Sequence, residues 1–136
     1  MNVSCHQMTR LIILVAVALV VAWSTTAPTQ ERFRVTGLYS NMKFGTEDVT
    51  GVEIFVVYGH EGHYAVVQCA EGVPGKPLVA KATVIKHAIE FEVPADRETL
   101  CPKGIFRGTV SPEGLQGKFE RVDWPGFLPR KKSYWQ

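Results

Sequence analysis

The chain has 136 residues, with 15 Lys and Arg against 13 Asp and Glu and a formal net charge of +2 at pH 7. Charges of both signs are interspersed and the longest basic run is residues 130–132, so the sequence lacks the basic face that nucleic-acid binding normally shows. Without an N-terminal signal segment roughly 110 residues remain, which is enough for one domain with one core and too few for two.

The first 24 residues are arranged like a secretory signal peptide. An apolar run at 11–23 follows a polar head that contains Arg10, and small residues follow the run. The run is shorter than the roughly 20 residues that a helix needs to span a bilayer. Residues 22–24 fit the small-x-small cleavage rule, and retention as an uncleaved anchor is the alternative. Cys5 precedes the run, so we do not expect lipid attachment. We expect an exported protein, periplasmic or secreted.

The rest of the chain consists of short apolar-rich runs separated by turn signals, with no sustained helical period. After a polar leader (25–30), we predict a barrel domain at 31–122 and an aromatic, basic C-terminal tail at 123–136. Alternation is clearest at 88–93, where apolar residues alternate with Glu90 and Glu92. The predicted strands are residues 31–39, 49–58, 63–69, 78–85, 88–93, 104–110 and 115–119.

Strands at this spacing predict an all-β, single-domain antiparallel fold, either a sandwich or a closed barrel. Glycines inside the strands, where they usually mark bulges or bends, favour closure into an up-and-down barrel of seven to eight short strands. An eighth strand has two candidate sources, residues 41–44 and the C-terminal tail. The interior could be hollow, or it could be filled by large side chains. The candidates for filling it are Phe55, Tyr64, Phe91, Phe106 and Phe119.

Two cysteines follow the signal segment, Cys69 and Cys101. In an exported protein an even cysteine count predicts a disulfide, here one that closes a loop of about 30 residues and contributes on the order of 3 kcal/mol. A redox-active pair would need a Cys-x-x-Cys arrangement, which is absent. We therefore expect a structural bridge.

No catalytic or metal-binding pattern stands out. His60 and His63 are three residues apart across a glycine-containing turn, whereas the zinc protease signature needs two histidines four apart on one helix. With His87 they are only weak candidates for a metal site. No nucleophile elbow or phosphate-binding glycine loop is present, so we expect neither a catalytic residue nor a cofactor.

The C-terminal tail gathers aromatic residues around two prolines and the basic triplet 130–132. We expect the tail to fold back over one end of the barrel and to bury Trp124 and Phe127. Insertion into a partner or a lipid headgroup layer is the alternative, and membrane contact is expected to be at most peripheral. The candidate binding residues are Tyr64, Trp124, Phe127, Tyr134 and Trp135.

Strand and turn residues form seven short segments of the sequence, at 37–41, 51–54, 67–72, 89–91, 104–108, 114–117 and 133–135. These segments resemble a group of small exported bacterial proteins of unassigned function. The resemblance implies one exported domain and carries over no catalytic residue. At the level of fold the chain is similar to avidin-like and lipocalin-like meander barrels, although a fold does not determine a function.

From these observations we expect a non-enzymatic binding module that holds a small apolar molecule or an envelope component at the barrel mouth. A protein-interaction role, as an inhibitor of an exported enzyme or an envelope assembly factor, is the alternative. A hydrolase whose residues are dispersed over the barrel loops is the third hypothesis.

Overall fold

The computed structural model describes residues 33–132, which contain nine β-strands and one short 3-10 helix. No helix in this range is long and apolar enough to cross a membrane. The predictions for residues 1–30, Tyr134 and Trp135 lie outside the described residues. The elements are β1 (Gly37–Ser40), β2 (Lys43–Phe44), β3 (Val49–Gly59), β4 (Gly62–Pro74), β5 (Leu78–Ile85), β6 (Ala88–Val93), η1 (Arg97–Thr99), β7 (Gly104–Val110), β8 (Gly114–Phe119) and β9 (Val122–Lys131).

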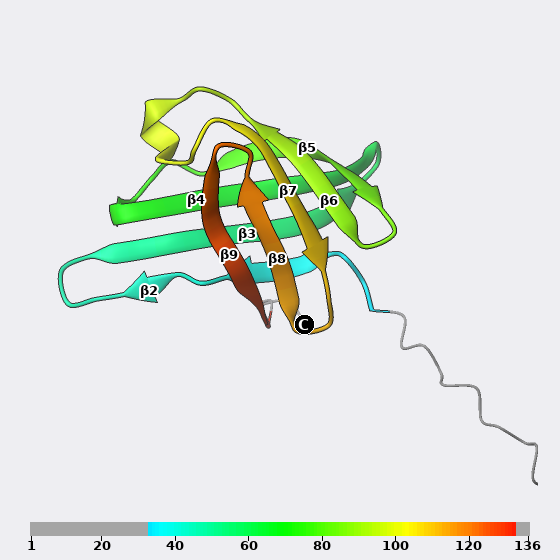
Figure 1. Ribbon diagram of the computed structural model, residues 1–136, viewed down its shortest axis with the longest axis horizontal. Coiled ribbons are helices and arrows are strands. Elements are labelled where there is room, and N and C mark those ends of the chain that lie inside the picture. The colour runs from blue at the N-terminus through cyan, green and yellow to red at the C-terminus, as the bar shows by residue number, and fades with distance from the viewer. Residues whose placement is uncertain (1–32, 133–136) are drawn as a thin grey trace, which may run out of the picture. The chain divides into compact units, whose positions relative to one another are not determined.

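Eight of the strands form a closed antiparallel barrel (Figure 1). From β3 to β9 each strand pairs with the next one along the chain, and β1 closes the barrel by pairing with both β9 and β3. The two-residue β2 pairs with the outer part of β3 only. Of the two candidate sources for an eighth strand, the C-terminal segment is therefore the one used. Residues 122–131 belong to the barrel as β9 and not to a separate tail.

The predicted strands agree with the observed ones, with two differences in length. The first strand begins at Gly37 and not at residue 31. Strand β3 has 11 residues and agrees with its prediction to within one residue, whereas β4 has 13 residues and continues well beyond its predicted end at residue 69. The β3–β4 pairing continues to Val49 opposite Gly72, beyond the point where β4 pairs with β5 at Val67. The extra length makes this hairpin overhang one end of the barrel (Figure 1).

Large aromatic side chains fill the barrel interior. The ring of Phe106 stacks on Phe91 at a centroid distance of 4.8 Å and meets Phe119 edge-on at 5.2 Å. Gly117 makes room for this arrangement, because a β-carbon there would lie 2.4 Å from the Phe106 ring. Phe91, Phe106 and Phe119 are at most 3% exposed. Three of the five predicted interior residues therefore point inward.

Phe55 and Tyr64, the other two interior candidates, lie on the outer face of the barrel. Side chains alternate between the two faces of a strand, and the buried positions of β3 and β4 include Ile54 and Ala65, their direct neighbours. Both aromatic residues are half-buried. The prediction failed because these strands are apolar on both faces, so the pattern alone did not show which face turns inward.

Arg130, near the end of β9, fixes the segment that precedes β1. Its guanidinium group lies over the ring of Tyr39, 4.9 Å from the ring centroid, and donates to the Tyr39 hydroxyl oxygen at 2.8 Å. It also donates to the carbonyl oxygens of Arg34 (2.7 Å) and Thr36 (3.2 Å). The first residue of the basic triplet thus holds the segment before β1 and does not form part of a free basic patch.

Tyr39 provides a pH-dependent test of this packing. Burial raises the pKa of Tyr39 from 10.0 to about 12, although the positive charge of Arg130 acts in the opposite direction. The folded state favours the neutral phenol, so this contribution to stability is complete below pH 10 and is lost as the pH rises through about 12. In a near-ultraviolet absorbance titration we expect one late tyrosine step, absent from Tyr39→Phe. Simultaneous ionisation of all tyrosines would contradict the packing.

Candidate functional site: the barrel mouth beside the disulfide

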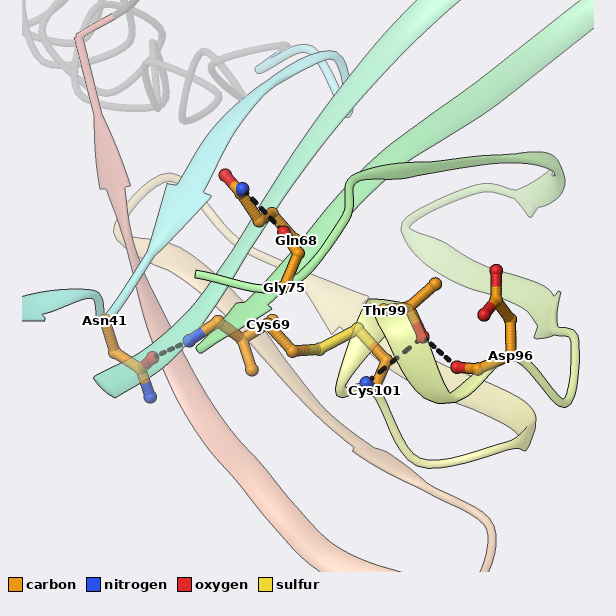
Figure 2. The surroundings of a disulfide bond; sticks show 8 residues. Asn41, Gln68, Cys69, Gly75, Asp96, Thr99 and Cys101 are labelled. Atoms are coloured by element: carbon orange, nitrogen blue, oxygen red, sulfur yellow. Dashed lines mark hydrogen bonds between the residues drawn. A yellow bond between two sulfur atoms is a disulfide. The ribbon is translucent and has the colours of Figure 1, made fainter. Parts of the chain in front are cut away.

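A disulfide marks the end of the barrel under the β3–β4 overhang. The sulfur atoms of Cys69 in β4 and Cys101 in the β6–β7 loop lie at bonding distance, and their Cα atoms are 5.3 Å apart (Figure 2). The predicted pair is thus brought together across a sequence separation of 32 residues. Cys69 is fully buried, so the bridge ties the loop directly to the core.

The loop that carries Cys101 is ordered by its own hydrogen bonds. Asp96 caps η1 by accepting a hydrogen bond from the backbone N–H of Glu98 at 2.9 Å. The hydroxyl of Thr99, a residue only 1% exposed, donates to the Asp96 carbonyl oxygen at 2.8 Å. It also accepts from the backbone N–H of Cys101 at 3.3 Å (Figure 2). The cysteine is therefore held in position by the turn before it.

A second loop, between β4 and β5, packs against the first. Gly75 donates its backbone N–H to the Cys69 carbonyl oxygen at 2.8 Å. Its own carbonyl oxygen accepts from the Gln68 side chain at 2.9 Å (Figure 2). A β-carbon at Gly75 would lie 2.3 Å from the Thr99 carbonyl oxygen, so only glycine fits this contact. The backbone N–H of Lys76 donates a hydrogen bond to the Glu98 carbonyl oxygen at 2.7 Å. Both loops form one rigid wall at this end.

A pocket of about 400 Å³ lies at this mouth. One side is formed by the overhanging hairpin, another by the disulfide-anchored loop, and a third by the start of β9. Six of the eight lining residues are apolar or glycine, and the polar exceptions are Thr50 and Glu71. The lining residues are Thr50, Gly51, Ala70, Glu71, Leu100, Pro102, Val122 and Trp124.

Trp124 connects the pocket with the core. Its ring stacks on Phe119 at a centroid distance of 5.7 Å, and the side chain remains half-buried. The β8–β9 register changes here, because Lys118 pairs with Pro125 while the next residue, Phe119, pairs with Val122. Asp123 and Trp124 are therefore extra residues on β9, and a bulge of this kind redirects side chains. The predicted burial of Trp124 is partial, because the bulge leaves the side chain lining the mouth.

Glu71 and Thr50 supply the polar atoms of the pocket. They are directly opposite each other in the β3–β4 ladder, at the overhanging end of the hairpin. Both are exposed, and within residues 33–132 the Glu71 carboxylate has no ion-pair partner within 4.0 Å. Sequence reasoning missed this pair, because neither residue belongs to a catalytic or ligand-binding motif.

A larger groove of about 620 Å³ crosses the outer face of β5–β9. Its floor includes the in-register glycines Gly108, Gly117 and Gly126. One wall consists of residues in ion pairs, Arg107 Nε with Glu90 at 2.8 Å and Lys118 Nζ with Asp123 at 2.7 Å. The groove is larger than the mouth pocket, and its charged groups already pair with one another.

The three histidines lie at the end of the barrel opposite the disulfide. His60 is in the β3–β4 turn, and His63, half-buried in β4, meets the ring of Tyr58 edge-on at 4.9 Å. His87 is in the β5–β6 turn and stacks on Phe33 at 4.4 Å. The β3–β4 and β5–β6 turns therefore lie at the same end of the barrel, a question that the sequence analysis could not answer. Residues 33–132 nevertheless contain no group of three or more His, Cys, Asp or Glu side chains that could hold a metal ion.

The structure does not bring the candidate binding residues together. Trp124 lies at the mouth, whereas Tyr64 is on the outer face, where its hydroxyl donates to Glu61 at 3.4 Å. Phe127 is 46% exposed, so the expectation that it would be buried with Trp124 is wrong. It follows the glycine at the bulged part of β9 and pairs with Gln116 beside the outer groove.

Comparison with protein-family models, curated proteins and solved structures finds no match to this chain.

Proposed function

We propose that the protein is an exported, non-enzymatic binding module that holds a small apolar molecule in the mouth pocket. The observation that carries the proposal is the mouth pocket of about 400 Å³, which is lined mainly by apolar side chains, with Thr50 and Glu71 as its polar groups. Ligand sites in proteins are typically concavities of about 300–1,000 Å³ with an apolar lining and a few placed polar groups. The pocket has both properties.

The rigidity of the walls supports the same function. The disulfide at Cys69 and the glycine contact at Gly75 hold the two mouth loops in place, so little ordering entropy remains to be lost when a ligand enters. Phe106 and Phe119 fill the interior below Trp124. The proposed ligand therefore sits at the mouth, and not deep in the barrel as in a hollow carrier. Its size is limited to one small molecule by the pocket volume of about 400 Å³.

The test is binding of the neutral fluorescent probe N-phenyl-1-naphthylamine to the purified exported protein. We expect its emission to rise on addition of the protein, and Trp124→Ala to weaken binding by at least about tenfold, because burying an aromatic group against this ring is worth roughly 1.5 kcal/mol or more. Titration of the probe with each variant measures the change.

Phe127→Ala is the matched control. It removes an aromatic side chain from the same strand, but that side chain is on the outside of the barrel and does not line the pocket. We expect its affinity for the probe to equal that of the wild type. Equal losses in the two variants, or no binding to the wild type, would refute the proposed site.

A further inference from the structure

We infer that the mouth pocket selects apolar molecules that carry a positively charged amine, with Glu71 as the residue that recognises the charge. The inference rests on the proposed function, and it specifies the chemical class of the ligand. Among residues 33–132, the carboxylate of Glu71 is the only charged group that lines the pocket. Its neighbour across the strand pair, Thr50, adds a hydroxyl that can accept a hydrogen bond.

The surroundings of Glu71 leave its charge available. The disulfide-anchored loop has two carboxylates, Asp96 and Glu98, and both form ion pairs with Lys76, at 3.7 Å and 3.1 Å. None of these three residues lines the pocket. Within the described part of the chain, Glu71 has no cation within 4.0 Å. An apolar ligand with an ammonium end would supply the missing partner.

Trp124 favours the same chemistry. The face of an indole ring attracts a cation, and the attraction increases when water is partly excluded, as it is beside an apolar pocket. The ring is fixed by its stacking on Phe119, so a ligand meets a surface that is already in place. A ligand carboxylate would instead meet the like charge of Glu71, without any Lys or Arg among the lining residues.

Basic residues near the mouth limit the size of the preference. Lys43 in β2 is directly opposite Thr50, so its side chain projects from the same face of the sheet as those of Thr50 and Glu71. Lys103 and Arg121 are next to the lining residues Pro102 and Val122 in sequence. None of the three lines the pocket. All are exposed and screened by salt, so they reduce the preference without reversing it.

The inference is tested by displacement of N-phenyl-1-naphthylamine with three ligands of one chain length, namely decylammonium, decanol and decanoate, each below the concentration at which it forms micelles. We expect decylammonium to compete about three- to tenfold better than decanol, and decanoate to compete worse than decanol. Glu71→Gln should remove the advantage of decylammonium and leave the affinity for decanol unchanged. Higher salt should reduce the advantage in the wild type.

Glu92→Gln is the matched control, because Glu92 is an exposed carboxylate on the outer face of β6 and does not line the pocket. This variant should keep the full preference. Equal competition by the three ligands, or a preference that persists in Glu71→Gln, would overturn the assignment to Glu71 while the pocket itself remains a binding site. Failure of the probe to bind the wild type would instead refute the proposed function.

Discussion

Replacing Phe106 with alanine is expected to lower the free energy of unfolding by about 3–5 kcal/mol, the range typical of a buried phenylalanine. The ring is fully buried and contacts Phe91 on one side and Phe119 on the other. Gly117 is pressed against it and has no side chain with which to fill the space. The cavity would therefore stay open. Denaturant unfolding followed by far-ultraviolet circular dichroism measures the change.

The matched control for Phe106→Ala is Phe44→Ala. Phe44 belongs to the short strand β2 and is 79% exposed, so its removal leaves no cavity in the core. We expect this variant to stay within about 0.5 kcal/mol of the wild type, as surface substitutions usually do. If Phe106→Ala were equally mild, the aromatic interior described here would be incorrect.

Removing the disulfide is the second large effect. In the double variant Cys69→Ala and Cys101→Ala, we expect a loss of about 3 kcal/mol in the free energy of unfolding, because a cross-link over 32 residues no longer restricts the unfolded chain. The anchored loop also supplies Leu100 and Pro102 to the pocket. Binding of N-phenyl-1-naphthylamine should therefore weaken as well, since the wall loses its connection to the core.

Reduction of the wild type should reproduce both changes, and the same reductant should leave the double variant unaffected. That comparison separates loss of the cross-link from loss of the two side chains. Unchanged stability and unchanged probe binding after complete reduction would show that the hydrogen bonds around Thr99 hold the loop without the bridge.

The strand pattern could be predicted well, whereas the position of the pocket could not. Alternation at 88–93 and the turn signals between runs are local properties, and the observed β5 to β8 agree with them closely. The aromatic, proline-containing segment 123–131 showed no clear alternation because β9 is bulged, so it did not look like a strand. Phe55 and Tyr64 were misplaced because the strands that carry them are apolar on both faces.

An all-β chain with one bridged pair of cysteines could be predicted, because strand periodicity and turn chemistry act between neighbouring residues. Three features become visible only once the barrel is folded: β9 pairs with β1, Arg130 turns toward Tyr39, and Glu71 shares a pocket with Trp124. These contacts join residues far apart in the chain. Their formation depends on closure of the barrel and on the bulge in β9, for which no local pattern in the sequence gives a signal.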